Sequence, residues 1–471
     1  MLTPLNNQCA PTLAIGEYLR NSGANYMVID HLPNHTLDEI TALVNLEEFS
    51  LLRTVLVKAE DGLLMIILPE DYFFDIGAFS QVMNRTVHPL SDENLLQLFS
   101  SLKIESVPPF PDFVGVEAIV EKRILSLNEV YIRPSIDNAL IGMKGKDFLK
   151  LLQAYPVLPV GFPLSQLNNF NHEHGCVSES IKKLTPLRIK QRVKETVELP
   201  AIPAIAHKIL KLRFNFQTTT QELAQTIEKD PSLAAQLMSW ARSPYYGYAG
   251  KIGSLEEAIV KVLGFDLVMN LALGIILGRT MQVKVQGPLG LRAYWEFAIT
   301  CAALVETIVK LIPPASRPLP GLAYLGGLLH NFGHLLLAQV FPPYFELLSQ
   351  YVQVNPHANI KAIENYVLGI GHDEIGAWLM QSWHLPPEVI AAISHHHDEE
   401  YEGEYAVYPN IVLLATRLLK RQGIGDADSV KLPEKILEKL QLNENDLTDA
   451  LEYVMSQRED LFELAAQVVP T

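Results

Sequence analysis

Histidines gather in three short stretches in the second half of the chain. They are His330 and His334 within the apolar stretch 321–341, His372, and the run His395, His396 and His397. Acidic residues follow the last run directly, at positions 398–400. Because neutral imidazole suits Zn, Fe and Ni, clustered histidines and carboxylates in a helical domain could bind a transition metal.

A structural role is the alternative for each of these residues. His330 could be a hydrogen-bonded core histidine, and the HHHDEE run could be a solvated helix end. His330 and His334 are four residues apart, so a single helix over 321–340 would place both on one face. Spacing alone leaves the metal site and the structural role open.

Other catalytic signatures are missing from the sequence. We find no GxSxG elbow, no GxxxxGK loop, no HExxH and no GxGxxG after a strand. Cys301 lies in the apolar stretch FAITCAALVETIV, which predicts a buried structural thiol.

The bulk composition is that of a globular protein. The 471 residues are 48% hydrophobic and 19% charged, and the length suggests two or three domains. A net charge of -16 argues against broad nucleic-acid binding, because phosphates would be repelled. The three cysteines lie far apart and form no CxxC motif, which is typical of a reducing compartment.

Targeting signals are not evident. The N-terminus lacks the basic start and long apolar core of a signal peptide. The apolar window 267–278 is too short to span a bilayer, and 321–341 carries two histidines and an asparagine that suit a buried helix. We therefore expect a cytoplasmic protein without a membrane segment.

The first 155 residues mix strand-like and helix-like segments. Residues 53–71 predict a hairpin around Asp61, residues 118–135 repeat this pattern, and residues 144–155 predict a helix. Residues 156–195 are rich in Pro, Gly and Asn and predict a linker, which leads into a basic helix over 182–197.

The rest of the chain predicts helices. Thr219 and Ser254 open capping-box patterns, Asp230 precedes a proline at a helix start, and Gly264 marks a helix end. Further helices are expected near 292–311, 321–340, 343–353, 359–369, 373–382, 386–396 and 408–421, with two short amphipathic helices in the tail, 432–467. The predicted parts are 1–155, the linker 156–195, the helical domain 196–425 and a C-terminal helical extension, 426–471.

Five segments of the helical part, in register over about 200 residues, resemble an HDOD domain. They are 199–212, 229–247, 254–273, 326–337 and 368–397. HDOD domains are helical relatives of HD and HD-GYP phosphohydrolases. The resemblance implies an HD-like helical bundle and a role in bacterial signalling, generally without hydrolysis.

The resemblance to catalytic HD proteins also implies where metal ligands would lie. The opening His of those enzymes falls at Phe297, and their His-Asp pair falls at His330-Asn331. Their next His falls at His372, and their final Asp falls near Thr416. Asn is a weaker ligand than Asp and cannot act as a general base.

Their paired His falls at His396-His397, or at His395-His396 if the register slips by one. The implied pocket is vestigial and holds no metal. Its residues are His330, Asn331, His372, His396 and His397. The GYP signature is also missing, because residues 400–409 depart from it.

The first part resembles a YbaK-type aminoacyl-tRNA deacylase domain, on the segments 51–71, 106–135 and 143–152. The catalytic Lys of that family falls at Arg53, which cannot easily take over its role. The Gly before its Pro-Pro pair falls at Ser106. The resemblance therefore implies a vestigial pocket at Arg53 and Ser106 that binds a small ligand or an aminoacyl group. A different register would use Lys58.

These observations predict an α+β YbaK-like domain followed by an all-α HDOD domain. The leading interpretation is a non-catalytic bacterial regulatory protein that senses a small molecule, contacts protein partners and uses no cofactor. The alternatives are a metal-dependent phosphohydrolase with a rearranged His-rich site and an aminoacyl-tRNA deacylase. An apolar face of the tail, 432–467, could pair with a second copy of the chain.

Overall fold

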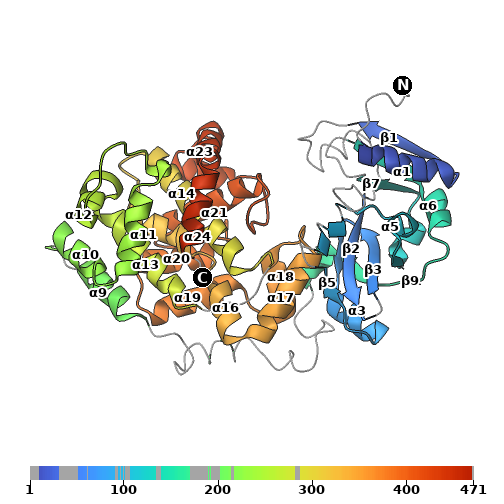
Figure 1. Ribbon diagram of the computed structural model, residues 1–471, viewed down its shortest axis with the longest axis horizontal. Helices are drawn as coiled ribbons and strands as arrows, with labels where there is room; N and C mark the ends of the chain where they lie inside the picture. The colour runs from blue at the N-terminus through green and yellow to red at the C-terminus, as the bar shows by residue number, and fades with distance from the viewer. Residues whose placement is uncertain are drawn as a thin grey trace. The chain divides into compact units, whose positions relative to one another are not determined.

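The computed structural model divides the chain into two compact units. It describes residues 10–30, 51–60, 62–90, 94–95, 97–98, 100, 107–133, 139–169, 189, 191, 202–213, 217–281 and 287–468. The first unit comprises Met1–Glu179 and Gln350–Ala358, and the second comprises Ser180–Ser349 and Asn359–Thr471. The first contains a mixed sheet and the described part of the second is helical (Figure 1), which confirms the predicted fold class. The four-part division of the chain stays a prediction.

The first unit is built on an eight-stranded sheet within the described residues. Its strand order is β1-β8-β7-β2-β3-β6-β9, and β5 pairs with β2 beside this path. The strands are β1 (Tyr26–Asp30), β2 (Leu51–Ala59), β3 (Gly62–Pro69), β5 (His88–Pro89), β6 (Glu117–Glu121), β7 (Glu129–Ile132), β8 (Ala139–Lys144) and β9 (Val157–Leu158). A second, two-stranded sheet pairs β4 (Tyr72–Phe74) with β10 (Gly161–Pro163).

Only one of the two predicted hairpins is present. β2 and β3 pair antiparallel with Ala59 opposite Gly62, which confirms the hairpin over 53–71. The hairpin over 118–135 is wrong: β6 lies parallel to β3, whereas β7 lies parallel to β2. The cause is η1 (Lys122–Ser126), a 3-10 helix that replaces a tight turn and separates the two strands.

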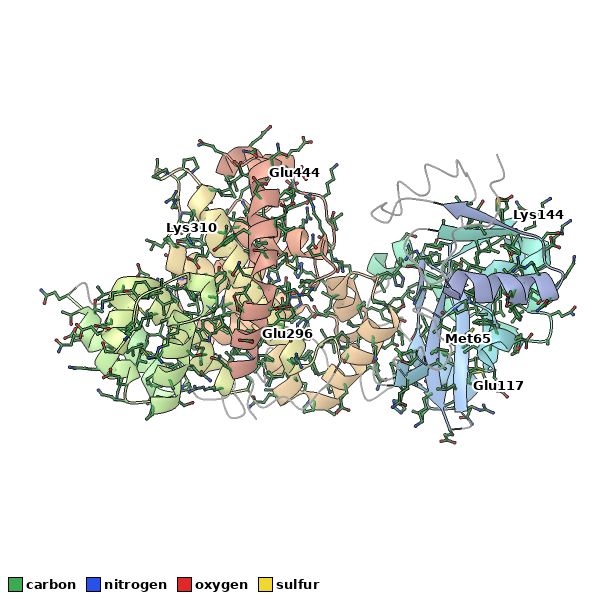
Figure 2. All side chains as sticks on the ribbon, turned by 45° about the horizontal axis from the view of Figure 1, so that its top comes forward. Met65, Glu117, Lys144, Glu296, Lys310 and Glu444 are labelled. Carbon is green, nitrogen blue, oxygen red and sulfur yellow. The ribbon has the colours of Figure 1, made fainter. Side chains whose placement is uncertain are left out.

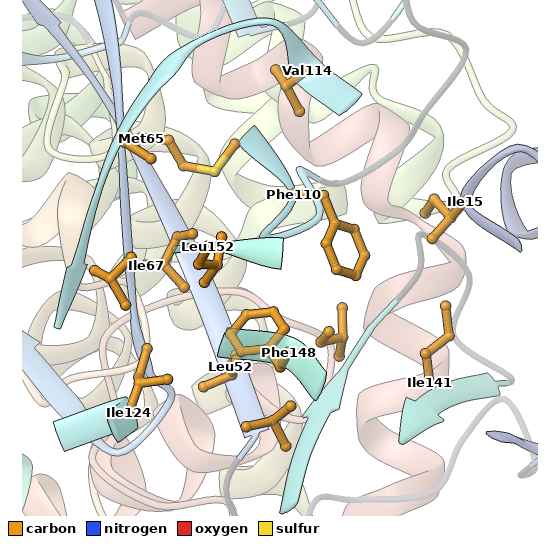
Figure 3. Packing of buried hydrophobic residues seen from close by; sticks show 14 of the residues in the cluster. Ile15, Leu52, Met65, Ile67, Phe110, Val114, Ile124, Ile141, Phe148 and Leu152 are labelled. Carbon is orange, nitrogen blue, oxygen red and sulfur yellow. The ribbon is translucent and has the colours of Figure 1, made fainter. Parts of the chain in front are cut away.

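Alternation along the strands assigns side chains to two faces of the sheet. On β2, Leu52 and Leu56 join the main core, whereas Leu51 joins a small cluster with Tyr131 and Leu140. Helices α1 (Ala10–Asn21), α5 (Pro111–Val114) and α6 (Gly145–Leu151) contribute to the main core. Figure 3 shows Phe110 and Phe148 among these buried side chains.

The elements around 145–169 differ from the expected boundaries. The helix predicted over 144–155 is α6, which ends earlier, at Leu151. Residues 157–169, predicted within the linker, form β9, β10 and η2 (Leu164–Asn169). The side-chain carboxylate of Glu121 holds this segment in place: it accepts hydrogen bonds from the backbone amides of Val160, at 2.6 Å, and Gly161, at 3.2 Å. The predicted basic helix over 182–197 lies almost wholly outside the described residues.

A segment from far along the sequence completes the first unit. Residues 350–358 begin 171 positions after Glu179, where the rest of this unit ends. The side chain of Asn355 pairs with the backbone of Phe74, accepting from its amide at 2.7 Å and donating to its carbonyl at 3.0 Å. Tyr351 stacks on Phe73 and donates to Asp75 at 2.6 Å. The segment is thus held by side chains that act as backbone partners.

The second unit consists of helices and short helical turns in its described part. They are α9 (Ala204–Arg213), α10 (Thr220–Ile227), α11 (Pro231–Ala241), η3 (Pro244–Tyr246), α12 (Leu255–Ala258), η4 (Ile259–Leu263), α13 (Phe265–Arg279), α14 (Leu291–Leu311), α15 (Pro320–Leu329), α16 (Phe332–Val340), α18 (Ile360–Leu368), α19 (His372–Ser382), α20 (Pro387–His395), α21 (Val407–Lys420), α22 (Glu434–Leu440), α23 (Glu444–Ser456) and α24 (Arg458–Val468). One further helix, α17 (Pro342–Val354), begins in this unit and ends in the segment 350–358.

The predicted helix starts are confirmed. The capping box at Thr219 is complete, and Asp230 accepts a hydrogen bond from the amide of Leu233 before Pro231. Ser254 caps α12, but the partner carboxylate of Glu257 bonds the amide of Gly253 instead. Gly264, with φ at 80°, ends η4 as predicted and precedes α13.

The tail contains three helices, α22 to α24, where two were predicted. α14 packs against α23 and α24. In Figure 2, the labels Glu296 and Lys310 mark positions towards the two ends of α14. Apolar residues of the tail, among them Leu451 and Leu464, are buried. These residues pack within the chain, and the pairing of two copies stays a prediction.

The described residues contain no single helix that is both long and apolar enough to cross a membrane. The neighbouring segments Leu255–Leu263 and Phe265–Arg279 reach that length only together, and they bend by 117°.

Replacing the buried Asn355 tests how the segment 350–358 is held. Asn355→Ala leaves the amide and carbonyl of Phe74 and one amino group of Arg53 without this partner. We expect the opening free energy of β4 and β10 to fall by about 2–4 kcal/mol, because an unsatisfied buried group costs about 1–3 kcal/mol. Hydrogen exchange read by mass spectrometry measures this. Gln350→Ala is the matched control and should change little, because the Gln350 side chain makes a long, exposed contact of 3.4 Å with His88 Nδ1.

Candidate functional site

The stretch 321–340 forms two helices rather than one. α15 ends at Leu329 and α16 begins at Phe332, with Asn331 outside helical geometry at φ -97° and ψ 15°. The imidazole Nδ1–H of His330 donates to the carbonyl of Gly327 at 2.7 Å, so the side chain occupies an acceptor that a continuing helix would use. The prediction that His330 and His334 share one helix face is therefore wrong.

The break sends the two histidines to different neighbours. His330 lies edge-on to Phe297 and to His396, at ring-centroid distances of 5.0 and 5.1 Å. His334 lies 4.2 Å from His372 in the same measure. Phe297, the residue at which the resemblance placed the first His of catalytic HD proteins, thus lies beside His330.

A buried carboxylate holds the centre of the cluster. Glu364, from α18, is fully buried. It accepts hydrogen bonds from Nε2–H of His334 at 2.6 Å, from the amide of His372 at 2.9 Å and from Nδ1–H of His372 at 2.8 Å. Three donors converge on one carboxylate, which is the arrangement that makes a buried charge tolerable.

Three imidazole nitrogens converge next to Glu364. Nε2 of His372 lies 3.3 Å from Nε2 of His396 and 3.3 Å from Nε2 of His397. The ligand atoms of all three residues lie within 4.8 Å of one another. His396 donates its Nδ1–H to the carbonyl of Ile393 at 2.8 Å, which leaves its Nε2 lone pair facing His372.

The cluster separates charged from neutral imidazoles. Burial disfavours a charge on His372, but Glu364 outweighs burial and raises the pKa of His372 to about 9. The same pairing lowers the pKa of Glu364 against the effect of burial. Burial lowers the pKa of His330 to about 4 and also lowers those of His396 and His397. At neutral pH one imidazolium therefore faces neutral imidazoles.

A second carboxylate reaches the cluster from the loop after α21. Asp426 accepts a hydrogen bond from the side-chain amide of Asn331 at 2.6 Å. Burial opposes its charge, but His397, His372 and His330 outweigh burial and lower its pKa. Among the described residues, His330 Nε2, Asn331 Oδ1 and Asp426 Oδ1 are buried acceptors without a hydrogen-bond partner. The site is therefore rich in unused lone pairs.

The structure thus brings together all five predicted residues of this pocket, and it adds three. His334 was noted in the sequence but not assigned to the pocket. Glu364 could have been found as a lone acid on the apolar side of ENYVLGIGH, eight residues before His372. Asp426 carries no such signal, because its loop reaches the site only through the fold. Thr416 uses its hydroxyl to donate to the carbonyl of Leu413 at 3.0 Å.

The environment of Cys301 can be compared with the prediction of a buried structural thiol. Cys301, on α14, is fully buried, and burial raises the pKa of its thiol. This confirms a buried residue that is poorly suited to act as a thiolate.

The first unit contains a cavity of about 480 Å³, which Arg53, one of the two residues of the second predicted pocket, helps to line. Arg53, Thr54, Glu70, Arg133 and His357 supply most of its polar lining. Apolar residues complete it, among them Leu52, Leu56, Leu90 and Ile132. Ser106 lies outside the described residues, and Lys58 is exposed and does not line the cavity.

Arg53 is fixed by its neighbours. It donates to the carbonyl of Val354 at 2.8 Å, to the carbonyl of Tyr72 at 2.9 Å and to the side-chain oxygen of Asn355 at 2.9 Å. Burial lowers the pKa of Arg53 to about 10, which leaves it protonated at neutral pH. Its guanidinium therefore tethers the segment 350–358 to the sheet.

Close backbone packing positions His334 against His372. Gly333, on α16, lies against the carbonyl of His372 and the amide of Gly376, so that an added Cβ would clash with both. Overpacking of a core typically costs about 1–3 kcal/mol. Gly333→Ala should therefore lower the free energy of unfolding of the helical unit by at least this amount. Gly253→Ala is the control, because its nearest neighbour is a flexible carboxylate 3.5 Å away. Denaturant unfolding monitored by circular dichroism measures both. Equal stability of the two variants would contradict this packing.

Comparison with known proteins identifies both parts of the chain. The HDOD domain family matches residues 199–399, and the aminoacyl-tRNA editing domain family matches residues 31–151. A protein from Marinobacter aquaeolei VT8, provisionally described as a signal transduction protein, is 31% identical. The similarity covers 97% of this chain and 99% of that one, with a TM-score of 0.79.

Two further relatives match over shorter regions. An HDOD domain protein of unknown function from Geobacter sulfurreducens is 21% identical over 61% of this chain and 98% of its own, with a TM-score of 0.47. An uncharacterized protein of Treponema pallidum (strain Nichols) is 26% identical over 212 residues. That match spans 44% of this chain but only 40% of the Treponema protein's length.

The matches fit a role in signalling. The match to the Marinobacter protein covers residues of both the sheet-containing unit and the helical unit. The chain belongs to the HDOD-domain family, with a YbaK-type aminoacyl-tRNA editing domain ahead of its HDOD domain.

Proposed function

We propose that this chain is a non-catalytic regulatory protein. Its first unit binds a small ligand, and its HDOD domain acts through contacts with protein partners. The net charge of -16 makes nucleic acid an unfavourable partner. The observation that carries the proposal is the state of Arg53, the residue at the catalytic position of the editing fold.

Three protein acceptors already use the guanidinium of Arg53. A protonated guanidinium cannot serve as a general base, and this one is not free to swing towards a substrate. Moving it would also remove a partner from buried Asn355. Arg53 is therefore better suited to hold the wall of the cavity than to perform deacylation.

The helical unit supports the same interpretation. Asn331 replaces the carboxylate that catalytic relatives use to bridge two metal ions. Its side chain is engaged by Asp426 at 2.6 Å. Glu364 is tied to His334 and His372 and is fully buried, so it has no free oxygen with which to activate a water.

The cavity of the first unit suggests the chemistry of the ligand. Its lining combines one acid, Glu70, and one exposed base, Arg133, with an apolar wall. A free α-amino acid would pair its ammonium with Glu70 and its carboxylate with Arg133. Its side chain would then contact Leu52 and Leu90.

The proposal predicts that purified full-length protein does not turn over substrates of either enzyme class. We expect no hydrolysis of phosphomonoesters, phosphodiesters or mischarged tRNA above buffer controls, with or without added divalent metal. Arg53→Lys should not restore deacylation, because the segment 350–358 still fills the space around this side chain. Turnover of about 1 per second or more, the usual range of enzymes, would refute the proposal.

Ligand binding should appear as thermal stabilisation. Individual amino acids are added to the full-length chain, and a specific ligand at about 100 times its Kd should stabilise the first unit by about 2.7 kcal/mol. Glu70→Gln should abolish the shift, because it removes the charge that pairs with the ammonium. Glu60→Gln, at the exposed hairpin end and away from the cavity, should retain it. A shift that survives in Glu70→Gln would place the ligand elsewhere.

A further inference from the structure

One segment of the chain connects the cavity of the first unit to the histidine network of the second. The segment 350–358 belongs to the first unit, whereas the residues on either side, up to Ser349 and from Asn359, belong to the helical unit. Four of its side chains line the cavity, and these are Gln353, Val354, Pro356 and His357. The link from the cavity wall to the helical unit is therefore covalent on both sides of the segment.

Asn355 fixes the chain on both sides of itself. Its side chain bonds the backbone of Phe74 and accepts a hydrogen bond from Arg53 at 2.9 Å. Its own amide donates to the carbonyl of Tyr351 at 3.1 Å, which continues the last turn of α17, and its carbonyl accepts from the amide of Ala358 at 3.0 Å. A shift of Asn355 away from Phe74 must therefore displace both the end of α17 and the turn that leads into α18.

The helices on both sides of the segment contact the histidine network. On α17, the ring centroid of Phe345 lies 6.5 Å from that of His334. On α18, Asn359 caps the first turn. Glu364, in the same helix, bonds His334 at 2.6 Å and His372 at 2.8 Å. Because a hydrogen-bonded helix moves largely as a unit, a displacement at either end of the segment reaches this network.

We propose that the segment 350–358 couples occupancy of the cavity to the order of the network formed by His334, Glu364 and His372. A ligand binds the cavity while the segment completes its wall, so it stabilises the docked segment over the released one. Docking in turn fixes the end of α17 and the start of α18. Coupling through one element with two states is reciprocal, so loosening α18 must also loosen the cavity wall. This inference rests on the proposed function, because a ligand of the cavity is its input.

The first test loosens the segment from the side of the cavity in the full-length chain. Asn355→Ala removes the side-chain hydrogen bonds that dock the segment and alters no residue of the histidine network. Amide hydrogen exchange across 360–373, read by mass spectrometry, should become at least about fivefold faster, the low end of typical coupling. Thr54→Val is the control, because Thr54 lines the same cavity but donates to the carbonyl of Val107. It should leave exchange across 360–373 unchanged.

The reverse test loosens the start of α18. Asn359→Ala removes the cap of this helix and should make exchange across β4 and β10 at least about fivefold faster. Asn443→Ala is the matched control, because Asn359 and Asn443 each cap a helix by accepting from the amide three residues on, at 2.8 Å. Asn443 caps α23, far along the chain from the segment, so its loss should leave β4 and β10 unchanged.

Two results with these variants would overturn the coupling. One is unchanged exchange across 360–373 in Asn355→Ala while β4 and β10 exchange faster. The other is an equal effect of Asn359→Ala and Asn443→Ala on β4 and β10, which would indicate a general loss of stability.

L-leucine, chosen for the aliphatic wall of the cavity, is the ligand probe for the unmodified chain. If it raises the melting temperature and Glu70→Gln abolishes the rise, it should also slow exchange across 360–373 by at least about fivefold. A thermal shift without this slowing would overturn the coupling as well. Absence of a thermal shift with leucine and every other amino acid would count against the proposed ligand alone, because the paired variants decide the coupling without any ligand.

Discussion

The burial of one carboxylate organises the helical unit. Glu364 is fully removed from solvent, and an isolated charge there would cost several kcal/mol. Imidazole groups from two other helices and one backbone amide offset that cost. The same contacts fix α16, α18 and α19 relative to one another, because each contributes one member of the network. The arrangement of the remaining histidines follows from this pairing, since His372 can present its Nε2 only while Glu364 holds its Nδ1.

In the first unit, the polar groups that bury together are an amide and a guanidinium rather than a carboxylate and imidazoles. Asn355 supplies both a donor and an acceptor to the backbone of Phe74, and its oxygen also receives Arg53. The five donors of a guanidinium suit several acceptors at fixed directions, which a lysine ammonium would match less well. An arginine at this position therefore suits a structural role, because it ties a segment that is distant in sequence to the sheet.

Local signals predicted the fold where local interactions decide it. The pairing of β2 with β3 and the helix starts at Thr219 and Asp230 depend on contacts within a few residues, and these were predicted correctly. The arrangement of residues 118–135 was predicted incorrectly, because the strands that pair with β6 and β7 depend on contacts across the whole sheet. Likewise the break at His330 arises from a single side-chain contact with Gly327 inside an apolar run whose periodicity continues unchanged.

The residues of the candidate site were likewise predictable only where the local sequence carries a signal. His330, Asn331, His372, His396 and His397 were found because their types and spacing survive in a chain that resembles a known family. Asp426 was missed since only folding brings its loop to Asn331. Arg53 was found, but its engagement with Val354 and Asn355 could not be, because about 300 residues separate the partners.

The balance of charge limits what the helical centre can hold. Two divalent ions in contact require bridging anions, and catalytic relatives provide them with carboxylates. Here Asn331 is neutral, Glu364 is already paired with His334 and His372, and Asp426 accepts a hydrogen bond from Asn331. The carboxylates described at this centre are therefore engaged with protein donors, which makes them poor bridges between two divalent ions.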